Sequence, residues 1–280
     1  MARPSFKALA GAWAALWWSG AALAQEAKTG GVPPAYLTTP LSRVPNEQAM
    51  VRRFFMPGLD EGYTPQGLVY AAGAVHVVGY GPGGCRLYSL SPHGKLQGQV
   101  DVPACRHGGG LAALGGGRFV VIDSRALFIV QSGRVMHKIV LEKPLVGSFG
   151  DFDGKDLWIG AYVKDGPGTL WRFSPAALKQ GKLSEADASS RITIPAKAQG
   201  MVFHGGQMWL TFSGATFGRL SRLDSATGQE VACYDMPAGI EDLGSDGRLI
   251  WSVSEAGAKK YLGWKTHFPL IFALDPALLK

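Results

Sequence analysis

The chain has 280 residues, of which only 18% are charged and 39 are glycine. Low charge with abundant glycine is typical of many short strands joined by tight turns, and it excludes a mainly helical protein. The formal net charge of +7 comes from basic residues scattered along the chain. Such scatter favours solubility and attraction to anionic cell-surface polymers, and it argues against nucleic-acid binding.

Residues 1–24 have the pattern of a cleavable signal peptide. Arg3 and Lys7 precede an apolar stretch at 8–23, and small residues stand at Ala22 and Ala24. This pattern predicts cleavage after Ala24 and a periplasmic or secreted protein, without stable membrane insertion after cleavage. No cysteine lies near the cleavage site, so no lipid anchor is expected. The alternative is an uncleaved anchor, because about 16 apolar residues nearly span a bilayer.

The mature sequence begins with an irregular segment and continues as one domain. Residues 25–48 are rich in Pro, Gly and Thr and are expected to form an extended leader. Residues 49–280 are long enough for a single domain with a full core, and we expect a monomer.

An internal repeat is the main evidence for the fold. Residues 66–90 align without a gap on residues 199–223, and Gln66 falls on Gln199. Three further copies of the repeat begin at residues 109, 148 and 241. The segments 109–123, 148–162 and 241–255 each contain an apolar strand, a Gly turn and a second apolar strand. Two more strands follow in most copies, at a spacing of roughly 40–50 residues, which is the pattern of β-propeller blades.

The repeat predicts an all-β protein, a β-propeller of five four-stranded blades. The fifth unit lacks a fourth strand, and residues 49–58 resemble the fourth strand of unit four, residues 230–239. An N-terminal strand is therefore expected to complete the last blade and close the ring. The alternatives are six blades, one of them degenerate, and an open β-solenoid.

In a propeller, the connections before the first strand and after the second strand of each blade surround one mouth of the central channel. A ring of polar groups there is where a ligand would bind. The residues at these positions are Gln66, Tyr80, the run starting at His107, Asp123 to Arg125, 148–151, Tyr162, Gln199, Ser213, Glu241, Asp242 and Glu255. The candidates for catalysis are Glu241, Asp242, Glu255 and His107, and those for ligand binding include Gln66, Tyr80, Asp123, Arg125 and Gln199. The alternative for the two glutamines is that they only satisfy backbone groups in a wet channel.

The fifth unit departs most from the repeat. Its connection between Glu255 and Pro269 is longer than in the other units and carries lysines and aromatics. Long loops in compact folds are commonly binding elements, and aromatics beside lysines suit an anionic or sugar-like ligand. We therefore expect Lys259, Tyr261 and Trp264 to overhang the mouth as a partial lid. The alternative is a solvated loop packed by its own aromatics.

Three cysteines in an oxidising compartment predict one disulfide and one unpaired thiol. Cys85 and Cys105 both fall at the predicted mouth, so we expect them to pair. Cys233 falls in a fourth strand and is expected to be a buried free thiol.

Two stretches resemble known families of secreted propellers. The phrase YTPQGLVY (63–70) resembles the opening of glutamine cyclotransferases of the plant and bacterial kind, which are five-bladed. The stretch 240–254 is faintly similar to that family's acidic strand, with Asp242 nearest its second acid. The family's second-blade Glu corresponds to glycine here, which leaves the activity open. The overall pattern is also similar to calcium-dependent lactonases, but the single asparagine, Asn46, lies before the propeller.

Two functional hypotheses follow. The first is an exported binding module that holds a small-molecule, saccharide-like or protein ligand, or a cell-envelope component, at the mouth. The second is a hydrolase or cyclotransferase that uses carboxylates at the same mouth. No cofactor or metal site is predicted. A calcium site built from Glu241, Asp242, Glu255 and Asp123 is the one alternative that the residue types permit.

Overall fold

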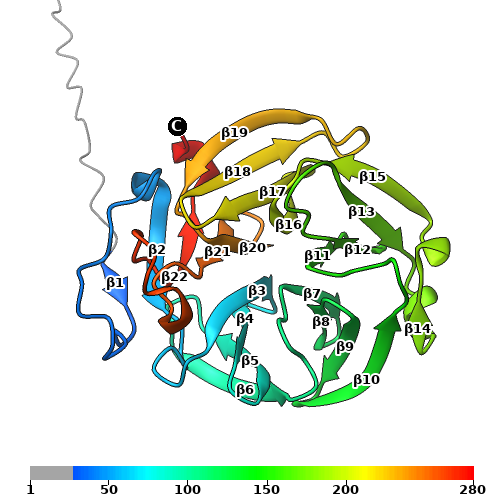
Figure 1. Cartoon of the computed structure of the whole chain (residues 1–280), viewed down its shortest axis with the longest axis horizontal. Coiled ribbons are helices and arrows are strands. Elements are labelled where there is room, and N and C mark those ends of the chain that lie inside the picture. The colour runs from blue at the N-terminus through cyan, green and yellow to red at the C-terminus, as the bar shows by residue number, and fades with distance from the viewer. Residues whose placement is uncertain (1–27) are drawn as a thin grey trace, which may run out of the picture.

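The computed structural model describes residues 28–280, so the predicted signal peptide lies outside the described residues. Five β-sheets form a closed ring around a central axis, with the first strand of each sheet innermost (Figure 1). The prediction of an all-β, five-bladed propeller is confirmed.

Each blade is an antiparallel sheet whose four main strands follow one another outward. Blade 1 contains β3 (Thr64–Ala71), β4 (Ala74–Gly81), β5 (Gly84–Leu90) and β6 (Leu96–Val102). Blade 2 contains β7 (Gly110–Gly115), β8 (Arg118–Asp123), β9 (Ala126–Gln131) and β10 (Arg134–Leu141). Blade 3 contains β11 (Phe149–Phe152), β12 (Leu157–Gly160), β13 (Gly168–Phe173) and β15 (Ser190–Ile194). Blade 4 contains β16 (Ala198–His204), β17 (Gln207–Gly214), β18 (Phe217–Leu223) and β19 (Glu230–Met236).

Blade 5 is built from both ends of the described chain. Strands β20 (Ile240–Ser245), β21 (Ile250–Ser254) and β22 (Leu270–Leu274) are followed in space by β2 (Met50–Phe55). Strand β2 runs antiparallel to β22, with Met50 opposite Leu274 and Phe55 opposite Leu270. The predicted closure of the ring is therefore confirmed.

Short elements extend the outer edges of two blades. From the leader, β1 (Thr29–Gly30) pairs in parallel with β2, and β14 (Lys182–Leu183) pairs in parallel with β10. The helical segments described are single 3₁₀ turns, at Glu47–Ala49, Ala177–Lys179, Glu185–Asp187, Lys259–Tyr261 and Pro276–Leu278. None of the helices within residues 28–280 is long and apolar enough to cross a membrane.

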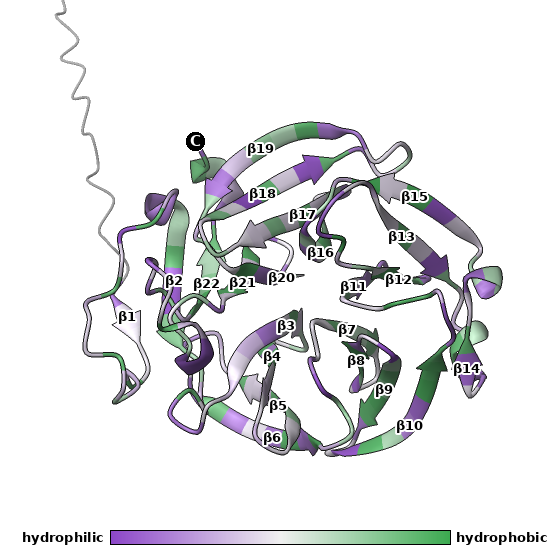
Figure 2. Ribbon diagram, in the orientation of Figure 1, coloured by the Kyte–Doolittle hydropathy of each residue, from purple (hydrophilic) through white to green (hydrophobic). Residues whose placement is uncertain are grey.

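Local sequence explains the hairpins. The turns at Ala72–Gly73 and Gly205–Gly206 hold both central residues at positive φ. Two-residue turns of this kind match the twist of the strands that they join. Hydrophilic and hydrophobic residues alternate along much of the outermost strand β6 (Figure 2). Along the outermost strand β19, the part-buried residues Ala232 and Tyr234 alternate with the exposed residues Cys233 and Asp235.

The disulfide between Cys85 and Cys105 is present, as predicted. Cys233 is unpaired but exposed, which corrects the expectation of a buried thiol. The reason is that β19 is the outermost strand of its blade, so Cys233 is on the face that alternation turns toward solvent.

Candidate functional site

A cavity of about 500 Å³ lies at the predicted mouth. Its walls come from the starts of first strands, from the connections that precede them and from the connections that follow second strands, and all five blades contribute. The lining residues are Gln66, His107, Ser124, Val146, Ser148, Tyr162, Gln199, Glu255 and Tyr261. Hydroxyl, carboxamide, imidazole and carboxyl groups thus meet in one space, which suits a small polar ligand.

Irregularities in the innermost strands aim the key side chains. The pairing register shifts between Pro65 and Leu68 in β3, between Ala198 and Gly200 in β16, and between Ile240 and Leu243 in β20. Bulges of this kind re-aim side chains near sites. These three bulges contain Gln66, Gln199, and Glu241 with Asp242, so the repeat-equivalent positions share one backbone device.

Two glutamines from neighbouring blades bind two glutamates of blade 5. Gln66 Nε2 donates to Glu255 Oε2 at 2.6 Å, and Gln199 Nε2 donates to Glu241 Oε1 at 3.1 Å. Blades 1 and 4 flank blade 5 in the ring, so the two equivalent glutamines contact the glutamates of blade 5 from opposite sides. The glycine after Gln199 permits this approach, because a Cβ on Gly200 would lie 2.4 Å from the Asp242 Cα.

The two glutamates form a coupled pair with one member on the cavity wall and one behind it. Burial raises the pKa of Glu241 well above its usual range, and the carboxyls of Glu255 and Asp242 raise it further. Burial also raises the pKa of Glu255, to about 7, against the opposing effects of Gln66 and Lys260. A side-chain hydrogen bond joins the two carboxyls. Since Glu241 keeps its proton to higher pH, it is the donor in this bond.

A chain of polar contacts leads from the glutamate pair to solvent. Burial raises the pKa of Tyr261 far above its usual range, and the nearby Glu255 carboxyl raises it further, so the phenol keeps its proton beside Glu255. The hydroxyls of Tyr80 and Tyr261 lie 3.2 Å apart, and Lys260 Nζ donates to the Tyr80 hydroxyl at 2.7 Å. Lys260 is exposed. The chain therefore links a nearly buried carboxyl to the surface.

His107 lies beside Tyr80, with ring centroids 5.0 Å apart, in a loop that Asp123 holds. The backbone N–H groups of Arg106, His107 and Gly108 donate to the Asp123 carboxylate at 2.9–3.3 Å. Burial lowers the pKa of His107, so the imidazole is neutral near pH 7 and offers either a donor or an acceptor. Cys105, disulfide-bonded to Cys85, anchors the same loop.

Asp242 is directed away from the mouth and into the centre of the ring. Its carboxyl accepts backbone N–H bonds from Leu68, Leu111 and Met201 at 2.9–3.2 Å. These residues belong to the innermost strands of blades 1, 2 and 4, so one side chain of blade 5 joins four blades. Burial raises its pKa although the N–H donors oppose this. Asp242 is placed to hold the ring together.

The remaining candidates lie around the cavity without lining it. Arg125 Nη1 donates to the backbone oxygen of Leu145 at 2.9 Å, and Lys259 is exposed at the outer side of the loop. The Trp264 ring packs against Tyr261, with ring centroids 4.4 Å apart. The leader supports this loop from behind, because Ser42 exchanges two hydrogen bonds of 2.9 Å with the backbone of His267.

Sequence reasoning missed some of the cavity wall. Val146 was not among the mouth positions, since nothing in its apolar type marks it. Lys260 lies in the predicted lid segment between Glu255 and Pro269, but its bond to Tyr80 was not foreseen, because that contact joins blades 5 and 1 across 180 residues. Within residues 28–280, no three His, Cys, Asp or Glu side chains are grouped as a metal site would require.

No protein-family model and no curated protein matches the sequence. Among solved structures, the chain is similar to a glutaminyl cyclase from Myxococcus xanthus, with a TM-score of 0.58 and 14% identity over 81% of this chain and 95% of that chain. A nidogen/laminin complex gives a TM-score of 0.48 at 14% identity, covering 78% of both chains. A Staphylococcus aureus virginiamycin B lyase gives 0.39 at 14% identity, covering 75% of this chain and 66% of that one. The first of these similarities supports the fold that the glutamine cyclotransferase resemblance implied, and at this identity it bears on the fold alone.

Proposed function

We propose that this protein is an acid–base enzyme, a hydrolase or cyclotransferase, that acts on a small polar molecule bound at the mouth. The observation that carries the proposal is the hydrogen-bonded pair of Glu255 and Glu241, of which Glu255 alone faces the cavity. Paired carboxyls with unequal proton affinities supply one base and one acid at the same pH.

The pair suits a reaction that moves a proton twice. With a pKa of about 7, Glu255 is present in both protonation states near neutral pH. As a carboxylate it would accept the proton of an attacking amine or water, and as an acid it would return that proton to the leaving amine or alcohol. Glu241, which stays protonated, would stabilise the Glu255 carboxylate through their hydrogen bond.

The rest of the cavity sets the class of ligand. Gln199, Ser124 and Ser148 offer hydrogen-bonding groups, and Tyr162, with 41% of its surface exposed, offers a ring face. Such walls fit hydroxyl- or amide-rich ligands, including saccharide-like molecules and the ends of peptides. Because the fold is similar to that of a glutaminyl cyclase, peptides with an N-terminal glutamine are included among the molecules to be tested as substrates.

A second candidate is a binding module without chemistry. It is favoured by the two glutamines, each of which already donates a hydrogen bond to one of the glutamates. In that case the acids would only position donors for a ligand. Export to the periplasm or exterior belongs to both candidates, and the disulfide supports it, because disulfides persist in oxidising compartments.

The test compares the mature protein with Glu255→Gln and Glu241→Gln, using Glu185→Gln on the remote turn Glu185–Asp187 as a matched control. Thermal shift against sugars, lactones, esters and glutaminyl peptides identifies ligands, and turnover is then measured on those that bind. We expect Glu255→Gln to lower kcat by at least about a hundredfold, the usual contribution of a positioned acid or base.

If a ligand still stabilises Glu255→Gln and even the wild type shows no turnover, the enzyme proposal is contradicted and the binding module is the candidate that stands. A ligand that stabilises the wild type and both mouth variants equally would place the site elsewhere.

A further inference from the structure

A second cavity, of about 410 Å³, lies on the face of the ring opposite the mouth, where blade 5 meets blade 1. It is bordered by the start of β2, by the turn between β20 and β21, and by the turn between β5 and β6. Half of its lining residues are basic or histidine, namely Lys28, Arg52, Arg53, His93 and Arg248, and none is acidic. We call this cavity the basic seam.

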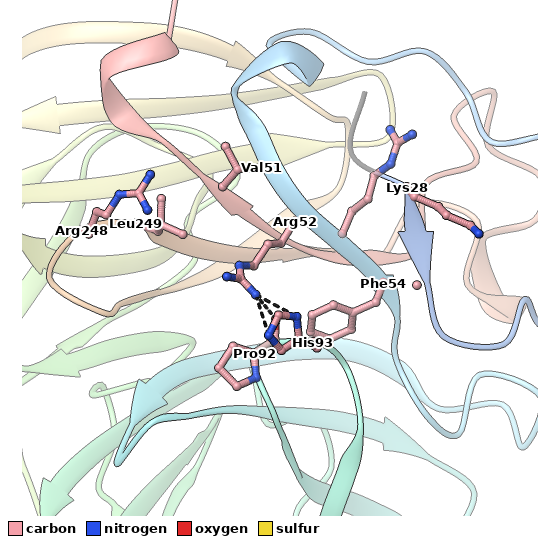
Figure 3. A pocket seen from close by; sticks show the side chains of 10 residues that line it. Lys28, Val51, Arg52, Phe54, Pro92, His93, Arg248 and Leu249 are labelled. Carbon is pink, nitrogen blue, oxygen red and sulfur yellow. Dashed lines mark hydrogen bonds between the residues drawn. The ribbon is translucent and has the colours of Figure 1, made fainter. Parts of the chain in front are cut away.

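Arg52 lies at the centre of the basic seam (Figure 3). Its Nη1 lies 3.0 and 3.2 Å from the two ring nitrogens of His93 and donates to the backbone oxygen of Pro92 at 3.4 Å. Within residues 28–280, no carboxylate pairs with it. A guanidinium with no carboxylate beside it keeps its charge uncompensated and its other N–H groups available.

The other two arginines of the seam do have acidic partners. Arg53 pairs with Glu47, and Arg248 lies 3.4 Å from Asp275. Lys28 has no ionic partner among the described residues, and it stands on the opposite wall from Arg248 (Figure 3). The uncompensated charge of the seam is therefore centred on Arg52 and supplemented by Lys28.

The backbone of β2 is irregular at this point. The register between β2 and β22 shifts between Met50 and Arg52, so that Val51 forms a bulge. After the bulge, Arg52 and Phe54 point to the same side of the strand, toward Pro92 and His93 (Figure 3). A bulge directly before an arginine that lines a cavity without acids is a second observation at the same place, because bulges re-aim side chains beside sites.

We propose that the basic seam binds an oxyanion, a phosphate or sulfate group, with Arg52 as the principal ligand and His93 beside it. The planar guanidinium presents paired N–H groups that match two oxygens of such a group. Lys28 and Arg248 flank this position, so a polymer that repeats the anionic group would gain further contacts. Because the seam faces away from the mouth, an anchored protein would keep its mouth open to ligands.

The experiment titrates the mature protein with inorganic phosphate by calorimetry, at ionic strength held constant with sodium chloride. Arg52→Gln is compared with Arg191→Gln, which removes the same charge from an exposed position on β15, outside the seam. We expect Arg52→Gln to weaken phosphate binding about tenfold, as loss of a charge-assisted hydrogen bond does, and Arg191→Gln to leave it within about twofold. His93→Gln is the second seam variant and should weaken binding less.

Absence of saturable phosphate binding would overturn the proposal. An equal loss of phosphate affinity in Arg52→Gln and Arg191→Gln would also overturn it, because only the overall charge would then attract the anion. Lys260→Gln, a change at the mouth, should leave phosphate affinity unaltered, and a loss there would instead place the anion at the mouth. Linear polyphosphate tests whether the bound anion is a free small ion or part of an anionic polymer. Tighter binding per chain than for inorganic phosphate points to an anionic polymer, and equal binding points to a free small anion.

Discussion

The mouth and the centre of the ring each hold a buried acid from the same strand, at consecutive positions. Glu241 and Asp242 are 1% and 0% exposed. Glu241 lies on the mouth side, behind Glu255, and its partners are the side chains of Gln199 and Glu255. Asp242 faces the centre, where its partners are backbone N–H groups. The difference teaches that the role of a buried acid follows from what surrounds it. A carboxyl beside another carboxyl can exchange a proton, whereas one that holds amides of three other blades is fixed by them.

The largest expected effect comes from breaking the central contacts. Asp242→Ala leaves three backbone N–H groups of different blades without an acceptor, and each buried unsatisfied donor costs about 1–3 kcal/mol. We expect the free energy of unfolding, measured with urea, to fall by about 3–5 kcal/mol or the ring not to close. Asp235→Ala, on the exposed edge strand β19, is the matched control and should stay within about 0.5 kcal/mol. A loss below about 1 kcal/mol in Asp242→Ala would contradict the central role.

The next largest effect is a change in how the free energy of unfolding depends on pH, and it comes from Glu255 at the mouth. Because the pKa of Glu255 in the folded protein is raised to about 7, its protonated form is favoured by folding. Its contribution to stability is thus fully present below the unfolded pKa and is lost as the pH rises through 7. Glu255→Gln should remove this loss, flattening the fall in unfolding free energy between pH 5 and pH 7.5 by up to about 3 kcal/mol.

The measurement is urea unfolding at both pH values, with Glu185→Gln as the control whose pH dependence should match the wild type. The buried Asp151, whose pKa is also raised to about 7, remains in both proteins, so the difference reports Glu255 together with its effect on Glu241. An unchanged slope in Glu255→Gln would mean that Glu255 ionises normally in the fold.

The smallest effect concerns the two equivalent glutamines. Gln66 donates to Glu255 and so holds its pKa down, and Gln199 does the same for Glu241. Gln66→Leu should therefore raise the pKa of Glu255 further and destabilise the fold by about 1 kcal/mol. Gln199→Leu should act first on Glu241. Carbon-detected NMR titration of the glutamate carboxyls distinguishes the two. Equal shifts in both variants would show that the glutamines act only through general packing.

Much of the fold was predictable because the physical signal repeats. The gapless match of 66–90 to 199–223 reflects strands, turns and bulges that coincide in blades 1 and 4. The missing fourth strand of the last unit predicted closure by residues 49–58, and position relative to the blade predicted the disulfide. Orientation was not predictable. The bulge that sends Glu241 to the mouth and Asp242 to the centre depends on the register between β20 and β21, and sequence alone treats the two acids as equivalent.

The closure of blade 5 by β2 also bears on the order in which the protein folds. Met50 pairs with Leu274, so the two strands that complete this blade are separated by nearly the whole chain. Pairings over such a separation form late, because loop closure has to precede them. Blade 5 is also the blade that carries Glu241 and Glu255. Of the contacts of the glutamate pair, the hydrogen bond from Gln66 to Glu255 spans 189 residues and forms only when blades 1 and 5 meet, whereas the bond from Gln199 to Glu241 spans 42 residues and does not need the closed ring.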